Sequence, residues 1–210
     1  MSITRCFFSL IFILMADLAQ AQNVPSSAVI QNVSLSGSGC SEASAAVSLS
    51  TDLQDLSILF DNFVLEANSS GMNPRNFTVE KNCVVSFDVV IPPGWAFSFR
   101  SVDYRGFANL PSRVQGYQRL LYQAPQSPIT SMRDASFMGP YQGNYTFQAA
   151  QKPGRNTFTP CGMQTVRLNM NAVLGVRFPG RGQHPEAMMA LDSQDLSMKQ
   201  TLQMDWRRCF

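Results

Sequence analysis

Cysteine is the residue type in this sequence whose number and spacing point most directly to chemistry, and that chemistry is disulfide formation. Of five cysteines, Cys6 lies in an apolar N-terminal segment, which leaves Cys40, Cys83, Cys161 and Cys209. Zinc ligands usually come in closely spaced pairs, whereas this sequence has no C-x-x-C and a single histidine. We therefore predict disulfides among these four cysteines and no metal site.

The order of the cysteines leaves three pairings open. Pairing Cys40 with Cys83 and Cys161 with Cys209 closes two loops of similar length. In the chain-entropy model each such loop contributes about 4 kcal/mol, and the nested pairing of Cys40 with Cys209 and Cys83 with Cys161 gives slightly more. Energy does not decide between them. We favour the sequential pairing, because each half of the chain then closes on its own.

Residues that would mark an active site are sparse in this chain. The one histidine, His184, lies in the loop-like segment "PGRGQHPE", and the hydrolase motif G-x-S-x-G is absent from the sequence. Asp61, Asp88 and Asp103 fall on predicted strands, where a glycosidase would need two carboxylates that meet in space. We expect these aspartates on solvated faces, and predict no catalytic residue and no cofactor.

Aromatic side chains offer a second kind of chemistry, the stacking of sugar rings. Trp95 and Trp206 continue alternating apolar runs, so we assign both to the core. Tyr117, Tyr122 and Tyr141 lie in segments that look like loops, and we predict them as ligand-contact aromatics on an exposed patch.

N-glycosylation sequons are the third kind of candidate site, since N-x-S/T is accepted on exposed segments in eukaryotic hosts. They occur at Asn32, Asn68, Asn76 and Asn144. Asn32 and Asn144 fall on the polar faces of predicted strands, where a glycan has room.

Apolar and polar residues alternate through most of the chain, which predicts that strands carry these candidate residues. In "CVVSFDVVI" the odd positions from Cys83 to Ile91 are mostly apolar. In the last run the even positions from Leu196 to Trp206 are apolar, with Gln200 the polar exception. This is typical of half-buried antiparallel strands. We expect an all-β antiparallel sandwich with two disulfides, a closed barrel as the alternative, and no helix.

Two irregularities are predicted within these strands. Trp95, Phe97 and Phe99 share one parity, whereas Val102 and Tyr104 share the other, and such a change of phase indicates a bulge, here near Ser101. The apolar alternation of residues 166–178 is long for one strand, so we expect a turn within "NMNA" at 169–172.

The N-terminal segment predicts export. Arg5 precedes the apolar run "CFFSLIFILMA", and Ala19 and Ala21 occupy the small positions before a cleavage site. We expect residues 1–21 to be a signal peptide and 22–210 a single domain, secreted or periplasmic. The apolar run is shorter than the roughly 20 residues of a spanning helix, so no stable membrane insertion is expected.

The charge of the chain excludes another class of partner. The formal net charge is +2, charged residues make up 14% of the chain, and the basic residues are scattered. Nucleic-acid binding usually requires a basic face or stripe, so we predict no nucleic-acid partner.

Several short segments together resemble a known family. They are "GSGC" at 37–40, "LFDNFVL" at 59–65, "KNCVVSFDVVIPPGWAFSF" at 81–99, "PCG" at 160–162 and "WRRC" at 206–209. Their order resembles the secreted bacterial and fungal family known as domain of unknown function 4360, over about Val29 to Cys209. The resemblance implies an exported, cysteine-stapled, β-rich domain and no particular activity.

These observations favour a secreted, disulfide-stabilised protein that binds or forms a surface, with a glycan or cell-surface component as its partner. A secreted carboxylate-dependent hydrolase of the glycosidase type is the alternative. The sequence does not indicate an oligomeric state.

Overall fold

The computed structural model describes residues 24–68, 77–123, 130–150, 158–180, 185–191 and 199–210. The predicted signal peptide, Asn76, His184 and the segment that holds Leu196 and Met198 lie outside the described residues. Within them no helix is long and apolar enough to span a membrane.

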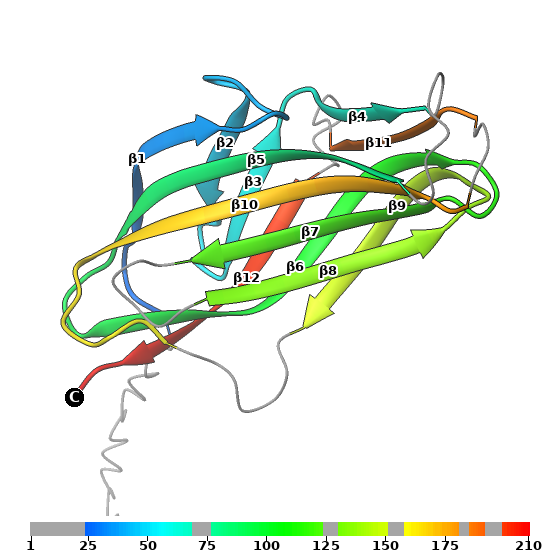
Figure 1. The fold of residues 1–210 in the computed structure, drawn as a ribbon. Helices are drawn as coiled ribbons and strands as arrows, with labels where there is room; N and C mark the ends of the chain where they lie inside the picture. The colour runs from blue at the N-terminus through cyan, green and yellow to red at the C-terminus, as the bar shows by residue number, and fades with distance from the viewer. Residues whose placement is uncertain (1–23, 69–76, 124–129, 151–157, 181–184, 192–198) are drawn as a thin grey trace, which may run out of the picture.

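The described chain folds into two antiparallel sheets that face each other, as Figure 1 shows. The five-stranded sheet has the order β1 (Val29–Ser36), β5 (Phe77–Val90), β10 (Thr165–Phe178), β7 (Gln115–Gln123) and β8 (Thr130–Met138). The seven-stranded sheet runs β2 (Ala45–Leu49), β3 (Asp55–Phe60), β12 (Lys199–Arg208), β6 (Trp95–Leu110), β11 (Ala187–Leu191) and β4 (Phe63–Ala67), with β9 (Tyr141–Ala150) also on β6. The sheets do not close into a barrel, so the predicted antiparallel sandwich is confirmed.

The long strand β6 organises the seven-stranded sheet. Its residues 101–110 pair with β9, residues 95–104 with β12 and residues 107–109 with β11. Because the stretches bound by β12 and β11 both overlap the stretch bound by β9, they must use the opposite edge of β6. β9 therefore lies on one side of β6, and all the other strands of this sheet lie on the other side.

Alternation places the core between the sheets. On β5 the side chains of Cys83, Val85, Phe87 and Val89 are fully buried, whereas Ser86 and Asp88 lie on the outer face of the sheet. These buried residues pack against apolar side chains of the facing sheet in one continuous cluster. Burial of this apolar area is the main contribution to stability.

The bulge predicted near Ser101 is confirmed. Ser101 pairs with Gln203 and Phe99 with Met204, so Arg100 is the extra residue on β6. The turn predicted in "NMNA" is wrong, because β10 continues without interruption from Thr165 to Phe178. β5 is equally long and pairs with it at every position, which stabilises the whole length.

The sequential disulfide pairing is confirmed. Cys40 is bonded to Cys83 and Cys161 to Cys209. The second disulfide lies beyond the end of β12, where the amide of Cys209 donates to the carbonyl of Gly94 at 2.8 Å.

Candidate functional site

A polar groove beside the Cys40–Cys83 disulfide is the candidate site. It consists of two adjacent hollows of about 400 and 270 Å³ that share the lining residues Asn62 and Lys81. We call this feature the polar groove, and its lining residues are Ser38, Gly39, Cys40, Ser41, Ser44, Asp61, Asn62, Val64, Glu66 and Lys81. One wall comes from the loop after β1, the other from the β3–β4 turn, and Lys81 of β5 lies between them.

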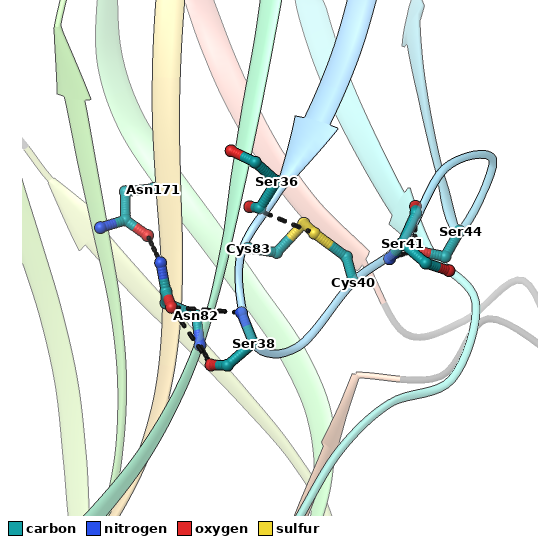
Figure 2. Close-up of a disulfide and its surroundings, with 8 residues drawn as sticks. All are labelled: Ser36, Ser38, Cys40, Ser41, Ser44, Asn82, Cys83 and Asn171. Atoms are coloured by element: carbon teal, nitrogen blue, oxygen red, sulfur yellow. Dashed lines mark hydrogen bonds between the residues drawn. A yellow bond between two sulfur atoms is a disulfide. The ribbon is translucent and has the colours of Figure 1, made fainter.

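The loop after β1 is fixed by close contact with β5, as Figure 2 shows around Asn82. Ser38 and Asn82 form a pair in which the Ser38 hydroxyl donates to the Asn82 amide oxygen at 3.2 Å and accepts from the Asn82 backbone amide at 3.1 Å. The Asn82 side chain also donates to Asn171 of β10 at 3.2 Å. The disulfide from Cys40 to Cys83 adds a covalent bond one residue further along β5.

The sequence "GSG" allows this close approach. A Cβ on Gly39 would lie 2.2 Å from the ring of Phe63, and a Cβ on Gly37 would lie 2.3 Å from the Asn82 carbonyl oxygen. Gly37 also has a φ of +135°, a backbone conformation that residues with a Cβ atom rarely adopt. The two glycines therefore let the loop lie directly on the sandwich.

Short polar contacts hold the later part of the loop after β1 and join it to the opposite wall. The Ser44 hydroxyl accepts from the Ser41 amide and donates to the Ser41 carbonyl, both at 2.8 Å (Figure 2). The Asp61 amide donates to the Ser44 carbonyl at 2.8 Å, which ties this loop to the β3–β4 turn. Asn62 completes the turn with a φ of +60°, a conformation that asparagine tolerates better than most residues.

The charges of the polar groove have both signs. The ammonium group of Lys81 donates to the carbonyl of Val64 at 2.8 Å, which holds the lysine across the groove. The side chains of Asp61 and Glu66 are exposed. The lining thus offers hydroxyl, amide, carboxylate and ammonium groups, and it contains no aromatic ring. Such a set can form several hydrogen bonds to a polar ligand.

The outer face of the five-stranded sheet is polar too, but its described side chains bind each other. Asp88 accepts from the side chain of Asn32 at 2.7 Å and from Arg167 at 3.2 Å. The hydrogen bond from Asn32, and then the contact with Arg167, lower the pKa of Asp88 below its usual value. Ser86 in turn donates to Asn169 at 2.8 Å. These side chains therefore already use much of their hydrogen-bonding capacity on each other, and less of it is left for a ligand.

Two of the three predicted ligand-contact tyrosines are buried, so their prediction as exposed loop residues is wrong. Tyr117 and Tyr122 lie on β7 and are 6% and 2% exposed. Tyr122 faces the core and packs edge-on against Phe99. Tyr141 is half-buried at the start of β9, and its hydroxyl donates to the Asn144 carbonyl at 2.6 Å.

Tyr117 is buried although it lies on the outer face of its sheet. Its ring covers Gly175 of β10, where a Cβ would lie 2.1 Å from the ring, and the guanidinium groups of Arg119 and Arg177 lie 5.3 and 5.9 Å from its centre. Its hydroxyl donates to Glu80. Burial, followed by this contact with Glu80, raises the pKa of Tyr117. In the sequence, the glycine within a strand could have indicated this contact, because a position without a side chain leaves room for an aromatic ring from the adjacent strand.

The three aspartates considered for catalysis do not converge. Asp88 lies on the outer face of the five-stranded sheet, and Asp103 lies on the outer face of the other sheet, where it accepts from Gln148 at 2.8 Å. Asp61 lies in the polar groove. Sequence reasoning placed all three on strands, and missed that the Asp61–Asn62 pair forms the turn that lines the groove.

The described sequons differ in their surroundings. Asn32 lies on β1 with a φ of +52°, and its side-chain nitrogen is bonded to Asp88. Asn68 follows β4 and is exposed, and Asn144 is exposed on β9.

Comparison with known proteins gives one family and several distant likenesses. The family model described as Domain of unknown function (DUF4360) matches residues 26–209. An uncharacterized secreted protein of Arthroderma benhamiae is 29% identical over 185 residues, which cover 88% of this chain and 73% of that protein. This relative and the two disulfides agree with the predicted secreted location.

Two solved structures show only weak likeness. The structure of TmCBM61 in complex with β-1,4-galactotriose is 9% identical with a TM-score of 0.27, covering 84% of this chain and 88% of its own. A CBM4 structure is 12% identical with a TM-score of 0.21, covering 79% and 90%. TM-scores this low support no statement about ligands.

Proposed function

The chain belongs to the DUF4360 family and is a secreted protein, and we propose that it is a non-enzymatic binding protein whose polar groove holds a segment of a glycan. The observation that carries this proposal is the lining of the groove, in which short polar side chains are gathered on a fixed frame. Serine hydroxyls and the Asn62 amide both donate and accept hydrogen bonds, as sugar hydroxyls do.

Rigidity supports binding by these residues. The Ser38 and Ser44 side chains and the Ser41 backbone are already hydrogen-bonded to the protein, and Cys40 is held by its disulfide. A ligand therefore does not have to order this wall, and less of its interaction energy is lost on binding.

Charge favours a neutral ligand. The lining carries two carboxylates, of Asp61 and Glu66, and one ammonium group, of Lys81, so both signs are present and the net charge is small. A groove of mixed sign does not attract a polyanion or polycation over long range. Neutral polysaccharide segments fit this balance better than acidic ones.

A glycan array probed with the purified secreted chain tests the proposal. We expect binding to neutral glycans, weakened about tenfold or more by Asp61→Ala, because a hydrogen bond to a charged group contributes about 1.5–3 kcal/mol. Asn62→Gly should also weaken binding while accepting the positive φ of the turn. Gln142→Ala, on the exposed side of β9, is the control and should bind as the unmodified chain does.

Three outcomes would contradict the proposal. One is the absence of binding to every neutral glycan on the array, and another is full binding by both groove variants. The third is the release of new reducing ends from a bound polysaccharide, which would indicate the hydrolase alternative.

A further inference from the structure

Strand β9 has an unprotected edge. Residues 141–150 pair with β6 on one side, and in the described part of the chain no strand pairs with the other side. Its sequence "YQGNYTFQAA" contains no charged residue and no proline. Long, uncharged edges of this composition pair readily with further strands, including those of a second copy.

The other edges of the described sheets carry recognisable protection. β1 has a bulge between Gln31 and Ser34, which interrupts its pairing register. β8 carries the charged Asp134, and β2 and β4 are only five residues long. Bulges, charges and short length are the usual means by which edge strands avoid association. β9 has none of these means within its described residues.

A sequon lies in the middle of this edge strand, at Asn144–Tyr145–Thr146. Asn144 and Thr146 are exposed, whereas Tyr145 is 4% exposed and its hydroxyl donates to Gln118 of β7 at 2.8 Å. The buried tyrosine fixes the alternation of the strand, so both outer positions of the sequon face solvent.

The side chain of Asn144 is also accessible for glycosylation, whereas the side chain of Asn32 is engaged in a hydrogen bond. The nitrogen that would carry a glycan at Asn32 donates to the Asp88 carboxylate at 2.7 Å. Among the described residues, the backbone of Asn144 pairs with Phe107 of β6 and its carbonyl accepts from the Tyr141 hydroxyl, whereas its side chain forms no hydrogen bond. A glycan at Asn144 therefore displaces no hydrogen bond of the described fold.

We propose that Asn144 carries an N-linked glycan when the chain passes through a eukaryotic secretory pathway, and that this glycan prevents β9 from pairing with β9 of a second copy. Neighbouring strands lie about 4.8 Å apart, and a branched glycan is much wider than this spacing. It would overlap the position of an added strand. The inference is independent of the polar groove and of its ligand.

Secretion of the full chain from yeast, followed by peptide mapping and light scattering, tests both parts. We expect the Asn144 peptide to be modified and the protein to be monomeric. Asn144→Gln and Thr146→Ala should each lose one glycan and shift to dimers or larger species. Thr146→Ser keeps the sequon and should keep both the glycan and the monomer.

Two further measurements separate edge pairing from misfolding. Trimming the glycan of the folded, unmodified protein with an endoglycosidase leaves one N-acetylglucosamine on a neutral Asn144, and should produce the same association without any substitution or added charge. Gln142→Lys added to Asn144→Gln should restore the monomer, because a charge on the edge replaces the glycan. An unmodified Asn144, or a deglycosylated protein that stays monomeric, would overturn the proposal.

Discussion

At the scale of single residues, Gln200 is the clearest example of a buried polar side chain whose hydrogen-bonding groups lack partners. It lies on the apolar side of β12 and is fully buried, as the alternation of that strand predicted. Neither polar atom of its side chain has a hydrogen-bond partner in the described protein. A buried polar group without a partner costs about 1–3 kcal/mol, so the core retains this residue at the expense of stability.

Replacing Gln200 by methionine should therefore stabilise the protein, by about 1–3 kcal/mol in the free energy of unfolding. Methionine has nearly the same shape and needs no hydrogen bond. The matched comparison is Gln118→Met, which removes a side-chain nitrogen that also lacks a partner but leaves the buried Tyr145 hydroxyl without its acceptor. Its gain in stability should therefore be smaller than that of Gln200→Met, and urea unfolding of both variants measures the difference. A loss of stability in Gln200→Met would show that its amide is satisfied in solution.

Asp88 gives the fold a dependence on pH. Because the side chain of Asn32, and next Arg167, hold the pKa of Asp88 below its unfolded value, the carboxylate stabilises the native state at neutral pH. This contribution is present above about pH 4, the unfolded pKa, and is lost as the pH falls through the lower native value.

Asp88→Asn should reduce stability at pH 7 and flatten the acid side of the stability curve below about pH 4. Unfolding by urea at a series of pH values measures both effects. Asn32→Gly, which accepts the positive φ, should raise the native pKa and produce part of the same flattening. An Asp88→Asn curve parallel to that of the unmodified protein would contradict this role.

At the scale of the element, alternation in the sequence predicted those strands in which one face is buried and the other solvated. β5 is the clearest case, since its odd positions face the core and its even positions do not. The bulge in β6 was predictable for the same reason, because an extra residue changes the phase of the alternation.

Elements whose environment depends on neighbouring strands were not predictable in this way. The segment "QGYQRLLYQ" of β7 lacks clear alternation, so its own residues do not predict a strand. In the structure a glycine on β10 and two arginines bury Tyr117 on the outer face. The uninterrupted length of β10 likewise follows from its pairing with β5 and not from its own residues.

The polar groove was not predictable either, because its walls are distant in sequence. In the sequence, "GSGC" served only as part of a family resemblance, and Asp61 was predicted on a strand. Only the fold brings them beside Lys81 of β5. Serine, asparagine and lysine at these positions carry no periodic signal, since short polar residues are common in all loops.

At the scale of the whole molecule, the two disulfides contribute similarly to stability but lie at different places relative to the polar groove. Their partners are separated by 43 and 48 residues, so the chain-entropy model gives each about 4 kcal/mol. Cys40 lines the polar groove, whereas Cys161 is bonded to Cys209 beyond the end of β12. Stability and binding should therefore separate when each disulfide is removed alone.

Paired substitution to alanine tests this separation. Cys161→Ala with Cys209→Ala should lower the free energy of unfolding by about 2–5 kcal/mol and leave glycan affinity unchanged at a temperature where the protein stays folded. Cys40→Ala with Cys83→Ala should lower stability at least as much, because Cys83 is also buried in the core. It should in addition weaken glycan binding, because the loop that carries Ser38 and Ser41 then loses its covalent attachment to β5. Equal affinities for the two paired variants, measured by titration calorimetry on folded samples, would place the binding surface away from the polar groove.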